Sequence, residues 1–117
     1  MRYMMLIHHD ETNIGDPAGQ QALYAAWGAF NEALAKAEGA APGERMQSPT
    51  QGKTVRTRNG ETNVVDGPYS DAKEQLGGYF FIEAKDFDEA VKWAELCPAS
   101  KYGTIEIRPI VQPDKNW

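Results

Sequence analysis

The dipeptide Asn59-Gly60 places the tightest constraint on the fold, because it separates two short runs rich in β-branched residues. The first run covers residues 54–58 (TVRTR) and the second covers residues 61–65 (ETNVV). Asn-Gly readily takes the positive φ angles of a two-residue type I′ turn. The two runs are therefore predicted to pair as an antiparallel hairpin.

The N-terminal run Tyr3 to His8 predicts a strand that is apolar on both of its faces. Tyr3, Met5 and Ile7 alternate with Met4 and Leu6. A strand with two apolar faces is typical of a central position in a sheet, covered on both sides.

A long helix is predicted to follow, with Asp16 as its N-cap, Pro17 at its first position and Gly39 as its stop. Its apolar residues recur at helical spacing and form a single stripe: Leu23, Trp27, Phe30 and Leu34. Residues 40–53, which contain two prolines and two glycines, predict an irregular connection with a short strand around residues 45–47 and the character of a mobile lid.

A second helix is predicted to begin at Asp86, with Glu89 three residues later, and to end before Pro98. Its expected inward residues are Phe87, Val91 and Ala94. Two further strands are expected at residues 78–84 and 104–111. In the last strand, Ile105 and Ile107 alternate with the charged pair Glu106 and Arg108, so one face is polar.

The predicted order is strand, helix, hairpin, strand, helix, strand. This order is that of an α+β, ferredoxin-like split βαβ fold with an additional hairpin strand. The 117 residues suit a single domain spanning residues 1–117. Both helices would cover one face of the antiparallel sheet, and the apolar opposite face would be costly to expose. A homodimer packed face to face is therefore expected.

The composition argues against two classes of binding partner. A formal charge of −5 disfavours nucleic acid and anionic lipid surfaces. No apolar run is long enough to cross a bilayer, and the N-terminus does not read as a secretory signal, so a cytoplasmic location without membrane contact is expected. Cys97 is the only cysteine, and it is expected to be a half-buried small residue at a helix end.

The segment 66–79 (DGPYSDAKEQLGGY) resembles the defining segment of the DGPF-domain proteins, a branch of the YciI-related family. Ordered matches extend over nearly the whole chain: residues 3–7, 55–56, 90–98 and 106–109. Tyr69 stands where the family signature has phenylalanine. The resemblance implies a dimeric α+β barrel with a cleft near each sheet. It also implies, as a family association, a possible accessory role beside an extracytoplasmic-function sigma factor.

Asp66 is a candidate general base, since a carboxylate at a strand end beside Gly67-Pro68 can face a cleft. The alternative, favoured about two to one, is that its side chain folds back on nearby backbone N–H groups to fix the turn. Tyr69 can present its phenol to a ligand or simply pack its ring. Lys73 and Glu74 can clamp a polar ligand or form a solvated charged loop.

Strand periodicity places Glu106 and Arg108 on the same face, where the guanidinium could bind a carboxylate ligand. A same-face salt bridge or a dimer contact is at least as good an interpretation. His8 is a candidate for proton transfer or ligand contact. His8 and His9 point to opposite faces of a strand, so no metal site is expected. Some members of the wider YciI-related family are assigned a His and Asp pair with the histidine near the first helix, yet residues 16–39 contain no histidine.

The sequence is compatible with two functions. The first is a cofactor-independent lyase, isomerase or dehalogenase that uses Asp66 or His8 for proton transfer, with Tyr69, Glu106 and Arg108 contacting the ligand. The second is a non-catalytic module that binds a metabolite or a sigma factor. The sequence lacks a phosphate-cradling glycine loop and a convincing metal motif, and no cofactor is expected.

Overall fold

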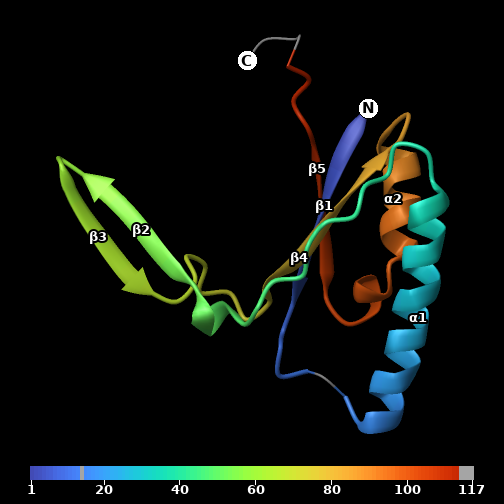
Figure 1. Ribbon diagram of the computed structural model, residues 1–117, viewed down its shortest axis with the longest axis horizontal. Coiled ribbons are helices and arrows are strands. Elements are labelled where there is room, and N and C mark those ends of the chain that lie inside the picture. The colour runs from blue at the N-terminus through green and yellow to red at the C-terminus, as the bar shows by residue number, and fades with distance from the viewer. Residues whose placement is uncertain (14, 114–117) are drawn as a thin grey trace.

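A computed structural model describes residues 1–13 and 15–113. Its main sheet has three antiparallel strands in the order β4-β1-β5, with bounds Gln75–Glu83 for β4, Arg2–His9 for β1 and Thr104–Pro109 for β5 (Figure 1). The N-terminal strand is central, as its two apolar faces predict. Outside β4 the chain continues the sheet only through isolated bridges, which pair Ala41 with Phe81 and Arg45 with Gly78. The short strand expected around residues 45–47 is thus reduced to a single bridge.

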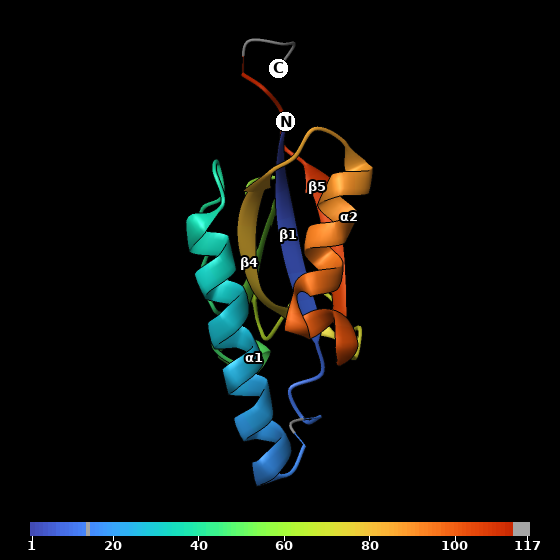
Figure 2. The same ribbon diagram turned by 90° about the vertical axis from the view of Figure 1, so that its right-hand side faces the viewer.

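Two α-helices, α1 (Pro17–Lys36) and α2 (Phe87–Leu96), lie side by side on one face of this sheet (Figure 2). The connections contain two single 3₁₀ turns, η1 (Pro49–Gln51) and η2 (Pro98–Lys101). The order and layering are those of the α+β, ferredoxin-like fold, which confirms the predicted class and the covering of one sheet face.

The helix ends follow local chemistry. The Asp16 carboxylate accepts a hydrogen bond from the Gly19 N–H at 2.7 Å, and Asp86 accepts one from the Glu89 N–H at 3.0 Å. These contacts satisfy N–H groups that have no partner within the helix. Helix α1 ends at Lys36 rather than running to Gly39, because Ala37 is already extended. Gly39, at φ +79°, serves the turn that brings the chain back to the sheet.

The core lies between the helices and the sheet. Phe30 is its centre, with edge-to-face contacts to Phe80 at 5.4 Å and Trp93 at 6.1 Å between ring centroids. The expected inward face of α2 was wrong in part: Ala94 is buried as predicted, but Ala90 is buried in place of Phe87 and Val91. Small residues are needed there because α2 packs close to the sheet, and Phe87 instead lies edge-on to Tyr3 at 5.2 Å.

The predicted hairpin consists of β2 (Lys53–Arg58) and β3 (Glu61–Asp66). Asn59 and Gly60 have φ angles of 52° and 79°, as a type I′ turn requires. The hairpin does not add a strand to the main sheet, contrary to expectation. It forms a separate two-stranded sheet that projects from the body, and we call residues 53–66 the arm (Figure 1).

Within residues 1–13 and 15–113, no helix or further sheet covers the face of the main sheet opposite the helices, and we call it the open face. Half-buried apolar side chains occupy its centre: Met4, Leu6, Tyr79 and Phe81. The Arg2 guanidinium lies over the Phe81 ring, 5.0 Å from its centroid. The arm leaves the body on the side of the open face, so the two enclose a V-shaped space in Figure 1.

Candidate functional site

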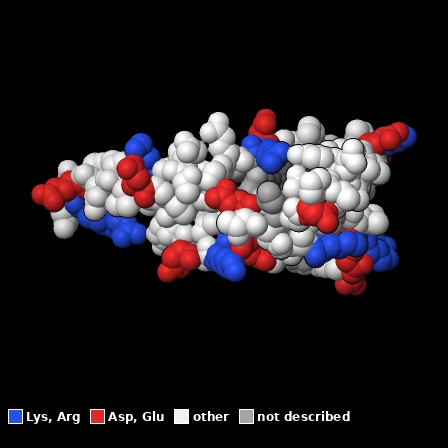
Figure 3. All heavy atoms as spheres, turned by 90° about the horizontal axis from the view of Figure 1, so that it is seen from below, with Lys and Arg blue, Asp and Glu red and all other residues white. Residues whose placement is uncertain are grey.

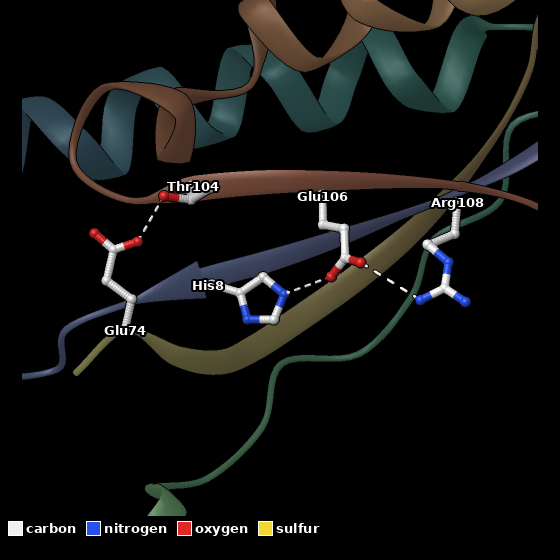
Figure 4. A network of polar contacts seen from close by, with 5 residues as sticks. All are labelled: His8, Glu74, Thr104, Glu106 and Arg108. Carbon is white, nitrogen blue, oxygen red and sulfur yellow. Dashed lines mark hydrogen bonds and ion pairs between the residues drawn. The ribbon is translucent and has the colours of Figure 1, made fainter. Parts of the chain in front are cut away.

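A polar network lies on the open face, formed by His8 from β1 and by Glu106 and Arg108 from β5 (Figure 4). The His8 Nε2 atom is 3.2 Å from Glu106 Oε1, and Arg108 Nη1 is 3.4 Å from Glu106 Oε2. The antiparallel register places Glu106 opposite Leu6 and Thr104 opposite His8, so the His8–Glu106 contact is diagonal across the two strands. The structure therefore brings together three of the five predicted site residues.

The chemistry of Glu106 determines the arrangement of protons on His8. A carboxylate can only accept hydrogen bonds, so Nε2 is the nitrogen that donates to Glu106, and in a neutral imidazole the lone pair is then on Nδ1. Among the described residues no side chain bonds to Nδ1. The His8 side chain is 28% exposed, so part of its ring is accessible to a ligand.

A β-bulge sets the place of His8 in the sheet. Ile7 pairs with Gly78 but His8 pairs with Leu76, so Gly77 is an extra residue on β4. Such a bulge bends a strand and re-aims the neighbouring side chains. The ring of His9 packs against Gly77 and lies edge-on to Tyr102 at 6.1 Å, which anchors the end of β1.

A second polar contact lies beside the network. Thr104 Oγ1 donates to Glu74 Oε1 at 2.6 Å, as Figure 4 shows. Glu74 was expected as a ligand clamp or a solvated residue, whereas Thr104 was missed as a site residue. The alternation that placed Glu106 and Arg108 on one face also places Thr104 there, so the signal was present in the sequence.

An open groove of about 870 Å³ runs between this end of the open face and the base of the arm. His8, Glu74 and Leu76 line it from the body. Further lining comes from residues 46–49, 51–55 and 67–70. A groove of this volume has room for a small organic molecule.

Asp66 lies outside this groove. Its carboxylate is 83% exposed and pairs with the Lys53 ammonium at 2.5 Å, on the neighbouring strand of the arm. The turn is held instead by a backbone bond from the Gly67 N–H to the Gly52 carbonyl at 2.8 Å. Within one chain Asp66 is therefore a cross-strand ion-pair partner, and its interpretation as a cap of the turn's N–H groups was wrong.

Tyr69 lines the groove and is 80% exposed. The Arg56 guanidinium lies 6.0 Å from the centroid of its ring. Lys73, expected beside Glu74, turns away to pair with Asp10 at 3.7 Å. Hydrogen bonds from the Thr12 hydroxyl and N–H lower the pKa of Asp10, and Lys73 lowers it further.

Cys97 lies apart from the network and is fully buried. Burial raises the pKa of its thiol to about 11, because the charged thiolate is poorly solvated there. A thiol held neutral in this way is a packing group rather than a nucleophile. Among residues 1–13 and 15–113, no three His, Cys, Asp or Glu side chains gather in a way that could hold a metal ion.

Sequence comparison places the chain in a family. The sequence model of the YCII-related domain matches residues 1–114, so the chain belongs to the YCII-related family. The uncharacterized protein R00369 of Rhizobium meliloti (strain 1021) is 32% identical over 114 residues, which cover 94% of this chain and 92% of that protein. Family membership confirms the resemblance stated on the sequence.

Structure comparison agrees on the fold. The chain is similar to 5-chloro-2-hydroxyhydroquinone dehydrochlorinase (TftG) from Burkholderia phenoliruptrix AC1100, solved in complex with 2,5-dihydroxybenzoquinone. The TM-score is 0.54 with 18% sequence identity, and the match covers 99% of each chain. At this identity the likeness shows a shared fold. In the part of the chain that the structure describes, no helix is both long enough and apolar enough to cross a membrane.

Proposed function

We propose that the groove binds a small ring compound bearing an acidic oxygen, and that the protein catalyses a cofactor-independent elimination from it. The observation that carries this proposal is the His8–Glu106 contact at 3.2 Å, because His8 also lines the open groove and Arg108 lies 3.4 Å from Glu106. A histidine oriented by a carboxylate, with its second nitrogen free, has the arrangement of a general base.

Each residue of the network has a distinct role in this proposal. His8 Nδ1 takes the proton of a ring hydroxyl, and the Glu106 carboxylate orients the imidazole and stabilises the imidazolium that forms. The Arg108 guanidinium, 68% exposed, pairs with the anionic oxygen of the substrate. Tyr69 contacts the ring from the arm side of the groove. Glu106 acts through His8 and is therefore a positioning residue.

The reaction balances without an oxidant or reductant. In the keto tautomer of the substrate, the carbon that bears the leaving group is tetrahedral. The bond of a ring O–H breaks as His8 takes the proton, and its electron pair forms a ring C=O bond. The neighbouring ring double bond shifts to the carbon that bears the leaving group, which departs with the pair of its own bond. The net loss is one proton and one anion, and the proton on His8 passes to water. The dehydrochlorinase with the same fold is named for an elimination of this type. In the present protein, the support for an elimination reaction is the network of His8, Glu106 and Arg108.

Asp66 is the other residue that the sequence predicts as a candidate general base. To act in the groove, its carboxylate would have to leave the Lys53 ammonium to which it is bound at 2.5 Å. The geometry thus favours His8 over Asp66.

The test uses 5-chloro-2-hydroxyhydroquinone as substrate, with chloride release followed by ion chromatography, and 2,5-dihydroxybenzoquinone as ligand, with binding followed by calorimetry. We expect H8N to lower kcat by about 10²–10⁴-fold with little change in ligand affinity. R108Q should raise KM and weaken binding by about 10-fold or more, because a charge-assisted bond is lost. K92Q, on the helical side, is the control and should match the wild type.

Three outcomes would decide against parts of this proposal. Full turnover by H8N excludes His8 as the base, and a large loss of kcat in D66N alone would return that role to Asp66. Tight binding without chloride release would support the non-catalytic, metabolite-binding alternative. The accessory role beside a sigma factor has no supporting observation in the described residues.

A further inference from the structure

The loop that leads into β4, residues 70–75, is held in one conformation by its own polar groups. The Gln75 side-chain amide donates to the Ser70 carbonyl at 2.7 Å and to the Ala72 carbonyl at 2.6 Å. The Ser70 hydroxyl in turn accepts a hydrogen bond from the Ala72 N–H at 3.1 Å. These bonds fix the loop from which Glu74 projects, so the position of Glu74 follows from the fold.

Glu74 is a half-buried carboxylate beside His8. Its Oε1 atom accepts a hydrogen bond from the Thr104 hydroxyl at 2.6 Å, and the register of β1 and β5 places Thr104 directly opposite His8. Figure 4 shows Glu74 on one side of His8 and Glu106 on the other. Among residues 1–13 and 15–113, no second group donates to the Glu74 carboxylate. Because a carboxylate can accept several hydrogen bonds, Glu74 retains acceptor capacity for a ligand.

The charge that a ligand meets at this end of the groove comes chiefly from Glu74. In the part of the chain that the structure describes, Glu74 is the one acidic residue that lines the groove. The lysine that lines it, Lys53, is paired with Asp66. Over the side of the molecule seen in Figure 3, acidic and basic side chains are interspersed without a broad patch of one sign. The local carboxylate therefore determines which ligands are attracted or repelled there.

We propose that Glu74 is a specificity-determining residue, which selects ring compounds with a neutral hydroxyl group at this position and disfavours compounds that are ionised there. This role rests on the proposed function, because it requires a hydroxylated ring in the groove next to His8. A neutral hydroxyl group donates a charge-assisted hydrogen bond to the carboxylate. An ionised oxygen has no proton to donate and is repelled by the charge of Glu74.

The same residue distinguishes the substrate of the proposed elimination from its product. Loss of hydrogen chloride from a chlorinated hydroxyhydroquinone leaves a hydroxyquinone. A hydroxyquinone is a vinylogous carboxylic acid and is ionised at neutral pH, whereas the hydroxyl groups of the hydroxyhydroquinone are far weaker acids. Glu74 thus favours binding of the substrate and release of the product. Arg108 lies four residues beyond Thr104 on β5, about 13 Å along the strand, so its attraction for an anion applies to a different part of the network.

Calorimetry at neutral pH tests the role of Glu74, with 1,2,4-trihydroxybenzene as the neutral ring and 2,5-dihydroxybenzoquinone as the ionised ring. The variant E74Q keeps the size of the side chain and an acceptor for Thr104, but it removes the charge. We expect E74Q to weaken binding of the trihydroxybenzene by about 5–10-fold and to tighten binding of the quinone by at least about 3-fold. The control is E95Q, which removes the same charge at an exposed position of α2 and should bind both compounds as the wild type does.

Opposite changes in affinity for the two compounds support the role of Glu74. Binding by E74Q that is unchanged for both compounds, or weaker for both by the same factor, overturns the selection. In that case, binding of the quinone and release of chloride by the wild type still support the proposed function. A wild-type protein that binds neither compound overturns the proposed function and the role of Glu74 together.

A second variant separates the charge of Glu74 from its position. T104V has nearly the shape of the wild-type side chain but cannot donate to Glu74, so the carboxylate keeps its charge and loses one partner. We expect T104V to weaken binding of the trihydroxybenzene by about 2–3-fold and to leave binding of the quinone unchanged. Quinone binding that is as tight in T104V as in E74Q overturns the proposal, because the lost hydrogen bond and not the lost charge would then be the cause.

Discussion

The ring of His9 lies so close to Gly77 that a β-carbon at position 77 would be 2.4 Å from its Nε2 atom. Gly103 restricts the same residue, since a β-carbon there would be 3.0 Å from His9 Cβ and 2.3 Å from the carbonyl oxygen of His8. Two glycines from different strand ends therefore accommodate the end of β1. This explains one glycine of the Gly77-Gly78 pair in chemical terms: it leaves space for an imidazole at the bulge beside His8.

The variant G77A should test that relationship. The added methyl group forces the His9 ring away from Tyr102 and disturbs the bulge that places His8, so we expect a loss of about 1–3 kcal/mol in unfolding free energy. Urea denaturation followed by circular dichroism measures this loss. Binding of 2,5-dihydroxybenzoquinone should weaken as well. Wild-type stability in G77A would show that the ring moves aside without cost.

A glycine in open space should behave in the opposite way. Gly28 lies within α1, and a β-carbon there would meet nothing within 4 Å. Alanine loses less backbone entropy in a helix than glycine does, so G28A should raise the unfolding free energy by about 0.5–1 kcal/mol. The same urea titration measures it and makes G28A the matched control for G77A. A destabilised G28A would indicate that this part of α1 contacts something that a single chain does not show.

Local signals predicted most of the fold. Asn59-Gly60 defined the hairpin because a two-residue turn is determined by its own residues, and it also fixed the register that sets Lys53 opposite Asp66. The ion pair of Lys53 and Asp66 could therefore have been predicted from the sequence. The alternation along β5 correctly put Glu106 and Arg108 on one face.

The contact between His8 and Glu106 could not be predicted in the same way. It depends on the register between β1 and β5, strands separated by most of the chain, and no local turn determines that register. The direction in which the arm projects depends on the backbone of residues 67–74. The groove at the base of the arm therefore could not be predicted from the sequence either. The inward face of α2 was misjudged because large apolar residues were preferred over Ala90, whose small size lets the helix approach the sheet.

Burial of Cys97 makes stability depend on pH at the alkaline end. The pKa of its thiol is about 11 in the folded chain, against an ordinary value of 9.0. The folded state therefore binds the proton more tightly, and this contribution is complete below pH 9 and is lost as pH rises from about 9 to 11. The difference in unfolding free energy between wild type and C97A should change across this interval and be constant below it. A constant difference throughout would contradict a buried, neutral thiol.

Asp10 should show the opposite dependence, at the acid end. Its pKa is lowered chiefly by hydrogen bonds from the Thr12 hydroxyl at 2.7 Å and the Thr12 N–H at 3.0 Å, with a smaller effect from Lys73. Because the folded state favours the carboxylate, the contribution is present above the ordinary value of 3.8 and is lost as pH falls through the lowered pKa. The carboxyl carbon shift of Asp10, followed by NMR titration, should show a larger upward change of pKa in T12V than in K73Q. A larger change in K73Q would mean that the ion pair, and not the threonine, controls this carboxylate.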